Sequence, residues 1–156
     1  MRAVVTRVSE ASVSINGETV GSISKGFLVL LGIHKNDREE TVKWTVDRIC
    51  GLRVFEDAGG KMNINPKDAG AEILIVSQFT LYADISSRRP GFTDAARPEQ
   101  AVPLYETVIR ECRERGFHVE TGKFGADMKV SSVNDGPVTI IVEKEEAKKL
   151  KEESPS

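Results

Sequence analysis

The chain has 156 residues, which is enough for one compact domain and too few for two of typical size. Hydrophobic residues make up 39% of it and support one sizeable core, while charged residues of both signs make up 29%, as on an ordinary solvated surface. Proteins that bind nucleic acid by neutralising many phosphates are usually basic, so the formal net charge of -2 argues against that class. The charge is compatible with a protein that contacts only the end of an RNA.

The amino-terminal residues MRAVVTRVSE do not resemble a signal peptide, because charged residues interrupt the apolar stretch. The longest apolar run, from Phe27 to Leu31, is far too short to span a membrane. Cys50 and Cys112 fall at apolar positions of predicted helices, so we expect buried hydrophobic residues there rather than a disulfide framework. We therefore expect a cytoplasmic protein without membrane contact, metal or cofactor.

The first third of the chain is predicted to be β-structure. Alternate residues from Val4 to Ile15 form two sets with the period of a strand. Asn16-Gly17 is a strong signal for a hairpin turn, because both residues tolerate positive φ, and the return strand is predicted over 19–24. The next strand, FLVLLGI at 27–33, is continuously apolar and is predicted to be buried on both faces.

Two helices are expected. Asp37 with Glu40 three residues later is a capping-box signature, which predicts that the first helix begins at Asp37, and Gly51 is a suitable end for it. The second helix is predicted from about Pro98 to Arg115.

Shorter strands and loops make up the remainder of the chain. A hairpin is predicted from residues 53–56 and 61–64, and a strongly apolar strand, EILIVSQFTL, from residues 72–81. A loop is expected over residues 85–97, and further strands over 117–120, 128–133 and 138–142.

Strands outnumber helices in this pattern, and the two helices separate blocks of strands. It predicts an α+β fold in which a mainly antiparallel, barrel-like sheet is covered by two helices. A doubly wound parallel fold would need more crossover helices. A single domain is predicted over residues 1–145, and the charge-rich residues 146–156 are predicted to be a disordered tail.

Several common catalytic motifs are absent from the sequence. It has no glycine-rich phosphate loop, no histidine pair at metal-ligand spacing and no G-x-S-x-G motif. A Ser–His–Asp site built on His34 or His118 stays open as an alternative. An enzyme with this sequence is expected to work without an imidazole base or a metal, on a substrate that is already reactive.

Two polar segments are candidates for a site. SQFTL at 77–81 closes an apolar strand, so its polar groups either cap the strand end or project into a pocket. NDGPVT at 134–139, taken alone, is typical of a turn, and its proline permits a cis peptide bond.

Together these segments carry a resemblance to a known family. SQFTL followed about fifty residues later by NDGPVT, with KMN (61–63) before them and TGKFGADM (121–128) between them, resembles the bacterial D-aminoacyl-tRNA deacylases. The resemblance begins with MRAVVTRVSEASV and extends over roughly residues 1–145.

The resemblance implies a homodimer with a β-barrel-like core, in which the Gly-Pro motif of one chain completes the active site of the other. Gly136 and Pro137, held in the cis form, would present carbonyl oxygens that exclude the side chain of an L-amino acid. Asn134 belongs to the same motif, and Arg7 is carried over as a residue that helps to hold it. The substrate would be the 3′ end of an aminoacyl-tRNA carrying a D-amino acid or a mischarged glycine.

The family's chemistry agrees with the missing motifs, because the ester between an amino acid and a ribose is intrinsically labile. Main-chain N–H groups of Phe79 and Thr80 would stabilise the oxyanion, and the Thr80 hydroxyl would orient water or donate a hydrogen bond. Ser77 and Gln78 would shape the site. The 2′-hydroxyl of the RNA is expected to take part, which removes the need for a protein base.

Other assignments have two interpretations. Phe124 and Met128 either form a wall for the adenine or pack in the core, and Arg88 and Arg89 either contact acceptor-stem phosphates or are solvated loop charges. The leading hypothesis is chiral proofreading in translation by hydrolysis of D-aminoacyl-tRNA. The alternatives are a non-catalytic nucleic-acid-binding module on the same fold and a hydrolase of a different small ester or amide.

Overall fold

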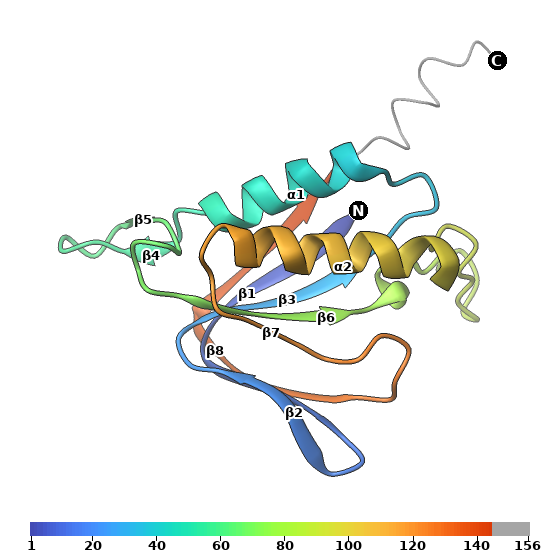
Figure 1. Cartoon of the computed structure of the whole chain (residues 1–156), viewed down its shortest axis with the longest axis horizontal. Coiled ribbons are helices and arrows are strands. Elements are labelled where there is room, and N and C mark those ends of the chain that lie inside the picture. Colours follow the sequence, from blue (N-terminus) through green and yellow to red (C-terminus); the bar gives the residue numbers. More distant parts are fainter. Residues whose placement is uncertain (145–156) are drawn as a thin grey trace.

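The computed structural model describes residues 1–144 and contains a six-stranded sheet with two helices against one of its faces (Figure 1). The predicted tail, residues 146–156, lies outside the described residues. The strands of the sheet are β1 (Arg2–Ile15), β2 (Glu18–Ile23), β3 (Gly26–Gly32), β6 (Glu72–Ser77), β7 (Val119–Thr121) and β8 (Lys129–Glu143). The other elements are the helices α1 (Glu39–Gly51) and α2 (Pro98–Glu114), the 3₁₀ helix η1 (Phe79–Tyr82), and a separate hairpin of β4 (Phe55–Glu56) and β5 (Met62–Ile64).

The central strand of the sheet is β1. It pairs antiparallel with β8 along one side, and with β3 and then β2 along the other. β6 continues the sheet beyond β3, and β7 continues it beyond β6. Because β2 bends back toward β6 and β7, the sheet takes a barrel-like form.

The predicted α+β fold with two helices over a barrel-like sheet is confirmed, and β1 pairs antiparallel with three strands as expected, although the sheet as a whole is mixed. The pairs β3–β6 and β6–β7 are parallel. The members of each pair are joined through a helix that crosses the sheet, and such a crossover returns the chain in its original direction. The two antiparallel hairpins were predicted correctly, and the first turns at Asn16 and Gly17, with φ of 50° and 82°.

β1 contributes side chains to two clusters on opposite faces of the sheet. Ala3 and Val5 belong to the cluster beneath the helices, whereas Val8, Ala11 and Val13 belong to a second cluster. The ladder with β8 is irregular between Val8 and Glu10, and a bulge of this kind changes which alternate residues point inward. The unbroken period of two predicted from Val4 to Ile15 is therefore wrong beyond Val8.

The two helices bury their apolar sides in the cluster beneath them. Val46 of α1 and Val108 of α2 are fully buried there. Cys50 and Cys112 are buried free thiols whose sulfur atoms lie 3.9 Å apart between the helices. The prediction that both cysteines act as small apolar residues is confirmed by their burial.

Two predicted strand boundaries are wrong. The strand expected over 72–81 ends at Ser77, because β6 has no partner beyond Leu31 of β3, and the chain turns into η1. The strands expected over 128–133 and 138–142 are one continuous strand, β8, which leaves the ladder with β1 only around residues 135–138.

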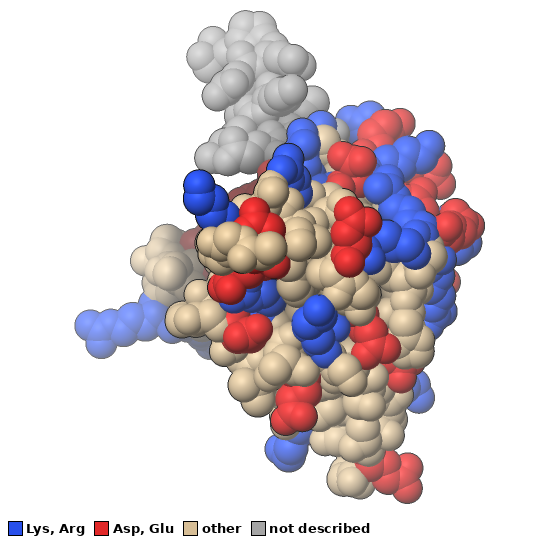
Figure 2. Space-filling view, turned by 90° about the vertical axis from the view of Figure 1, so that its left-hand side faces the viewer, with Lys and Arg blue, Asp and Glu red and all other residues tan. Residues whose placement is uncertain are grey.

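The described surface carries charges of both signs. Acidic and basic side chains are interspersed over the face shown in Figure 2, in keeping with the small net charge. None of the helices in residues 1–144 has the length and apolar character needed to cross a membrane.

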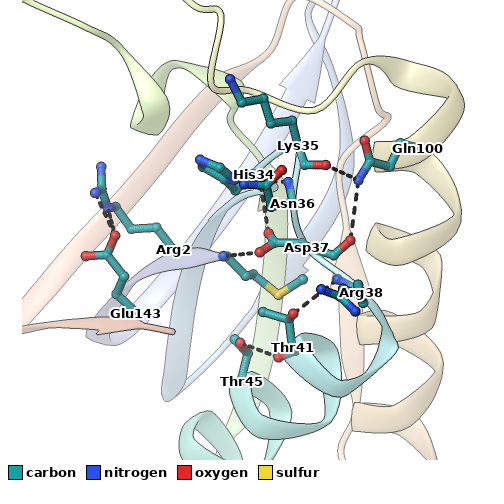
Figure 3. A network of polar contacts seen from close by, with 11 residues as sticks. Arg2, His34, Lys35, Asn36, Asp37, Arg38, Thr41, Thr45, Gln100 and Glu143 are labelled. Carbon is teal, nitrogen blue, oxygen red and sulfur yellow. Dashed lines mark hydrogen bonds and ion pairs between the residues drawn. The ribbon is translucent and has the colours of Figure 1, made fainter. Parts of the chain in front are cut away.

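Asp37 organises the connection between β3 and α1 (Figure 3). Its carboxylate accepts hydrogen bonds from the amino group of Met1 at 2.6 Å and from the amide of His34 at 2.7 Å. Because the carboxylate is engaged there, the N-cap of α1 is one residue later than the predicted Asp37. Arg38 is its N-cap, and the Arg38 amide donates to the Thr41 hydroxyl at 3.1 Å.

Replacing Asp37 by alanine is expected to lower the free energy of unfolding by about 3–5 kcal/mol, because it removes the carboxylate from a buried ammonium group. Asp94→Ala is the matched control, since Asp94 pairs with Lys35 at 3.2 Å on the surface and should contribute less than about 1 kcal/mol. Urea denaturation of both variants measures the difference, and equal losses would contradict the assignment.

Candidate functional site

The carboxyl ends of the parallel strands β3 and β6 open on a cavity of about 200 Å³. Leu31 and Ser77 line it from the two strands, and Ala101 lines it from α2. The segment between β7 and β8 closes another side. The remaining lining residues are Ile33, Gln78, Phe79, Thr80, Ala96, Phe124, Gly125, Ala126 and Met128.

Six of the ten residues predicted for the site meet in this cavity: Ser77, Gln78, Phe79, Thr80, Phe124 and Met128. The other four, Arg7, Asn134, Gly136 and Pro137, do not line it within the same chain. The small residues Ala96 and Ala101, whose short side chains leave space in the cavity, were not predicted, because no motif or periodicity marks them.

η1 begins with two residues that line the cavity and whose amides have no intrahelical acceptor. The first amides of a helix have no intrahelical acceptor, and in η1 these belong to Phe79 and Thr80. Within residues 1–144 neither amide donates to a main-chain carbonyl outside η1. The Thr80 hydroxyl accepts a hydrogen bond from the Gln78 side chain at 3.1 Å and is otherwise exposed. The rings of Phe79 and Phe92 meet edge to face, with their centroids 5.0 Å apart.

Gly32 allows η1 to lie directly against the end of β3. A Cβ atom at this position would lie 3.0 Å from Cβ of Leu81 and 3.2 Å from the carbonyl oxygen of Gln78. The Gln78 amide also donates to the carbonyl of Leu31 at 2.8 Å, which fixes the entry to η1. The missing side chain of Gly32 therefore sets how closely the polar segment approaches the sheet.

Phe124 and Met128 line the cavity and also pack against the core. Phe124 lines the cavity and also packs against Tyr105, at 5.9 Å between ring centroids. The Tyr105 hydroxyl donates to the carbonyl of Ile75 at 3.1 Å, which ties α2 to β6. Met128 lies against Gly122, where a Cβ atom would come within 2.4 Å of its sulfur. Core packing therefore holds the wall in place.

The Gly-Pro segment forms an exposed corner on β8. Thr6 of β1 is opposite Thr139, but Val8 is already opposite Asn134, so residues 135–138 protrude from the ladder. The Asn134 side chain closes this corner: its oxygen accepts from the Val138 amide at 2.9 Å, and its nitrogen donates to the Thr139 hydroxyl at 3.0 Å. The Gly136-Pro137 peptide bond is cis, and both residues are exposed.

Arg7 holds the corner from inside. This arginine is 6% exposed, and its Nε donates to the carbonyl of Asp135 at 3.0 Å. Its Nη1 donates to the carbonyl of Val54 at 2.6 Å, and the carboxylate of Glu56 lies 3.9 Å from its Nη2. A buried guanidinium needs such partners, so Arg7 links the corner to the start of the β4–β5 hairpin.

Neither histidine lines the cavity. His34 is buried beside Tyr82, and burial lowers its pKa although the nearby carboxylate of Asp37 opposes the shift. Its Nδ1 accepts from the Asn36 amide at 3.0 Å. His118 is exposed and lies 3.8 Å from each of the carboxylates of Glu72 and Glu120. The alternative of a Ser–His–Asp site at this cavity therefore lacks a histidine there.

Comparisons with known proteins agree with the sequence motifs. The family model described as D-Tyr-tRNA(Tyr) deacylase matches residues 4–143. Two relatives named D-aminoacyl-tRNA deacylase each align over 144 residues and cover 92% of this chain: the protein of Thermotoga petrophila is 54% identical, with 97% of its length covered, and that of Brevibacillus brevis is 56% identical, with 99% covered.

Two solved structures are also similar. A c-Myc DNA unwinding element binding protein is 43% identical, with a TM-score of 0.88 over 92% of this chain and 99% of its own. A probable eukaryotic D-amino acid tRNA deacylase is 15% identical, with a TM-score of 0.80 over 90% of this chain and 97% of its own. The latter likeness concerns the fold alone.

Replacing Gly32 by alanine is expected to displace η1 by a few tenths of an ångström and to lower the free energy of unfolding by about 1–3 kcal/mol, because the added methyl group overpacks the contact with Leu81. Gly51→Ala is the control. A Cβ atom there meets nothing within 4 Å, and alanine in a helix is favoured over glycine by up to about 1 kcal/mol. Denaturant unfolding compares the two, and a stable Gly32→Ala variant would refute the proposed close approach.

Proposed function

The chain belongs to the D-Tyr-tRNA(Tyr) deacylase family, whose members are hydrolases of an ester bond, and we propose that the cavity at the ends of β3 and β6 is the catalytic site. The observation that carries the proposal is the meeting of four consecutive residues, Ser77 to Thr80, with Phe124 and Met128 around one cavity. The ester of a D-amino acid with the terminal ribose of tRNA would bind there and be cleaved to free amino acid and tRNA.

The amides of Phe79 and Thr80 would stabilise the oxyanion that forms when water attacks the ester carbonyl. They are the first two amides of η1, they belong to residues that line the cavity, and fixed donors of this kind stabilise developing negative charge. The Thr80 hydroxyl would orient the attacking water or donate to the substrate. Since neither histidine lines the cavity, the 2′-hydroxyl of the RNA would take the part of a protein base.

The terminal adenosine would occupy the apolar part of the cavity. Phe124 offers a ring that is already fixed by Tyr105, and Met128 offers an adaptable apolar surface. The rest of the RNA would pass over the loop that carries Arg88 and Arg89, which is closed by main-chain hydrogen bonds between Asp84 and Gly91.

Discrimination between D- and L-amino acids would come from the Gly136-Pro137 corner of a second copy of the chain. The corner is exposed and is held rigidly by Arg7 and Asn134, and it does not line the cavity of its own chain. Its carbonyl oxygens would occupy the space that an L side chain requires, and rejection by a clash needs such rigidity. Glycine has no side chain to reject, so glycyl-tRNA would also be hydrolysed.

A homodimer is the assembly that this proposal requires. On the sheet face away from the helices, Val4, Leu30 and Ile141 are neighbours on three adjacent strands, and Ile141 is 66% exposed. A partly exposed apolar row of this kind is suited to contact with another protein surface. The dimer would act in the cytoplasm, where it would remove D-amino acids from tRNA before they enter translation.

A second candidate function is a non-catalytic nucleic-acid-binding module on the same fold. The name of the solved structure that is 43% identical to this chain favours it, because that protein is described as binding a DNA element. Such a module would bind tRNA or DNA with an affinity that falls as salt is added, and it would leave the ester intact.

Hydrolysis of matched D- and L-tyrosyl-tRNA, without added metal, tests the catalytic proposal. The D ester is expected to be cleaved faster, and Thr80→Ala should lower kcat by about a hundredfold if the hydroxyl acts in the transition state. Thr80→Ser keeps the hydroxyl and is expected to stay near wild-type activity. Binding of tRNA without cleavage would favour the second candidate function. Equal rates on both esters would refute the proposed selectivity for the D ester.

The Gly136→Ala variant tests whether the Gly136-Pro137 corner excludes the L ester. Its Cβ atom would lie 2.7 Å from Cγ2 of Val138 at a φ of 136°, so the corner must shift, and hydrolysis of the L ester should rise about tenfold relative to the D ester. Gly17→Ala is the control, because it also places alanine at positive φ but meets nothing within 4 Å.

Mixed dimers then test whether the corner acts across the interface. In a dimer of one Thr80→Ala chain and one Gly136→Ala chain, a single site combines an intact threonine with the intact corner of the other chain. Selective hydrolysis of the D ester should therefore return on mixing. Persistent hydrolysis of the L ester by mixed dimers would mean that the corner acts within its own chain.

A further inference from the structure

Arg2 connects three elements of the fold at the far end of η1. Its Nε and Nη2 donate to the Glu143 carboxylate of β8 at 3.1 and 2.7 Å (Figure 3). Its Nη1 donates to the carbonyl of Leu81 in η1 at 2.5 Å. The guanidinium also lies over the ring of Tyr82, 4.8 Å from its centre. A side chain of β1 thus contacts the last two residues of η1.

η1 is short enough for these contacts to restrict its other end. It has four residues, so Leu81 and Tyr82, which contact Arg2, directly follow Phe79 and Thr80, which line the cavity. Both pairs belong to one helical turn, and a displacement of one pair is passed to the other.

Arg2 and Gly32 restrict the position of η1 in different directions. Gly32 limits how far η1 can move toward β3, because Leu81 and Tyr82 already approach the space of its missing side chain. The hydrogen bond from Arg2 to Leu81 limits movement away from that position. The Glu143 carboxylate in turn orients Arg2 by accepting hydrogen bonds from its Nε and Nη2, and the Arg2 side chain is 33% exposed.

We propose that Arg2 is a positioning residue for ester hydrolysis, which sets the place of the Phe79 and Thr80 amides by holding the carbonyl of Leu81. The inference rests on the proposed function of the cavity. Arg2 itself does not line the cavity and would not contact the substrate. Its removal should therefore lower kcat and leave KM for the aminoacyl-tRNA nearly unchanged.

The shape of the guanidinium is essential to this role. Arginine has donors in a planar fork and serves Glu143 and Leu81 at the same time, whereas lysine is a single point of charge. Arg2→Lys should keep the ion pair with Glu143 and lose the contact with Leu81. Glu143→Gln should keep an acceptor for Arg2 and leave the contact with Leu81 in place.

The experiment measures kcat and KM for D-tyrosyl-tRNA with the wild-type chain and with Arg2→Met, Arg2→Lys, Glu143→Gln and Arg53→Met. Arg53 is the matched control, since it also donates to a main-chain carbonyl, that of Asn63, but in the β4–β5 hairpin at the other end of the sheet (Figure 1). Both Arg2 variants are expected to lose about ten- to a hundredfold in kcat, with KM changed less than about twofold. Glu143→Gln and Arg53→Met are expected to stay within about threefold of wild type.

Amide chemical shifts of the free protein give a second readout that does not depend on activity. In Arg2→Lys the signals of Phe79 and Thr80 should move, while those of β1 residues beyond Val8 should not. Unchanged kcat in both Arg2 variants, or a rise in KM with kcat unchanged, would overturn the inference. If the wild-type chain cleaved no aminoacyl-tRNA, the proposed function would fail separately, and unmoved signals of Phe79 and Thr80 would still refute the role of Arg2.

Discussion

The parallel pairing of β3 with β6 is the constraint on which the candidate site depends. It aligns the carboxyl ends of the two strands, so that Leu31 and Ser77 finish side by side at one edge of the sheet. The chain can then turn into η1 only if it passes closely over Gly32. Parallel strands need a crossover, and the α1 segment that provides it also covers the core beneath the cavity.

The two halves of the proposed active site are built on different strands, and β1 lies between them. On one side β1 pairs with β3, which supports η1, and on the other side it pairs with β8, which carries the Gly136-Pro137 corner. Arg2 extends from β1 to η1, while Arg7 extends from the same strand to the corner. β1 therefore supplies one arginine that holds η1 and one that holds the corner. In the proposed dimer, the η1 of one chain would meet the corner of the other chain.

Local sequence signals predicted the elements that depend on local chemistry. Asn16-Gly17 specified its turn, and the order of helices and strands followed from periodicity. The segment from Ser77 to Thr80 was singled out because polar residues at the end of a buried strand need partners, and all four of its residues line the cavity. Its 3₁₀ conformation was missed, because it ends against Gly32, a residue distant in sequence. The parallel direction of β6 was also missed, because strand pairing joins residues that are distant in sequence.

The irregularity near Ser9 has a consequence for how this chain can vary in length. Before it, Ala3 and Val5 face the first cluster and Val8 faces the second, whereas beyond it Ala11 and Val13 face the second, so the alternation of β1 shifts by one residue there. Gaining or losing an odd number of residues between Val8 and Ala11 would turn Ala11 and Val13 away from the second cluster, whereas an even number would preserve their direction. Insertions and deletions at this point should therefore be tolerated when they contain an even number of residues, whatever their length.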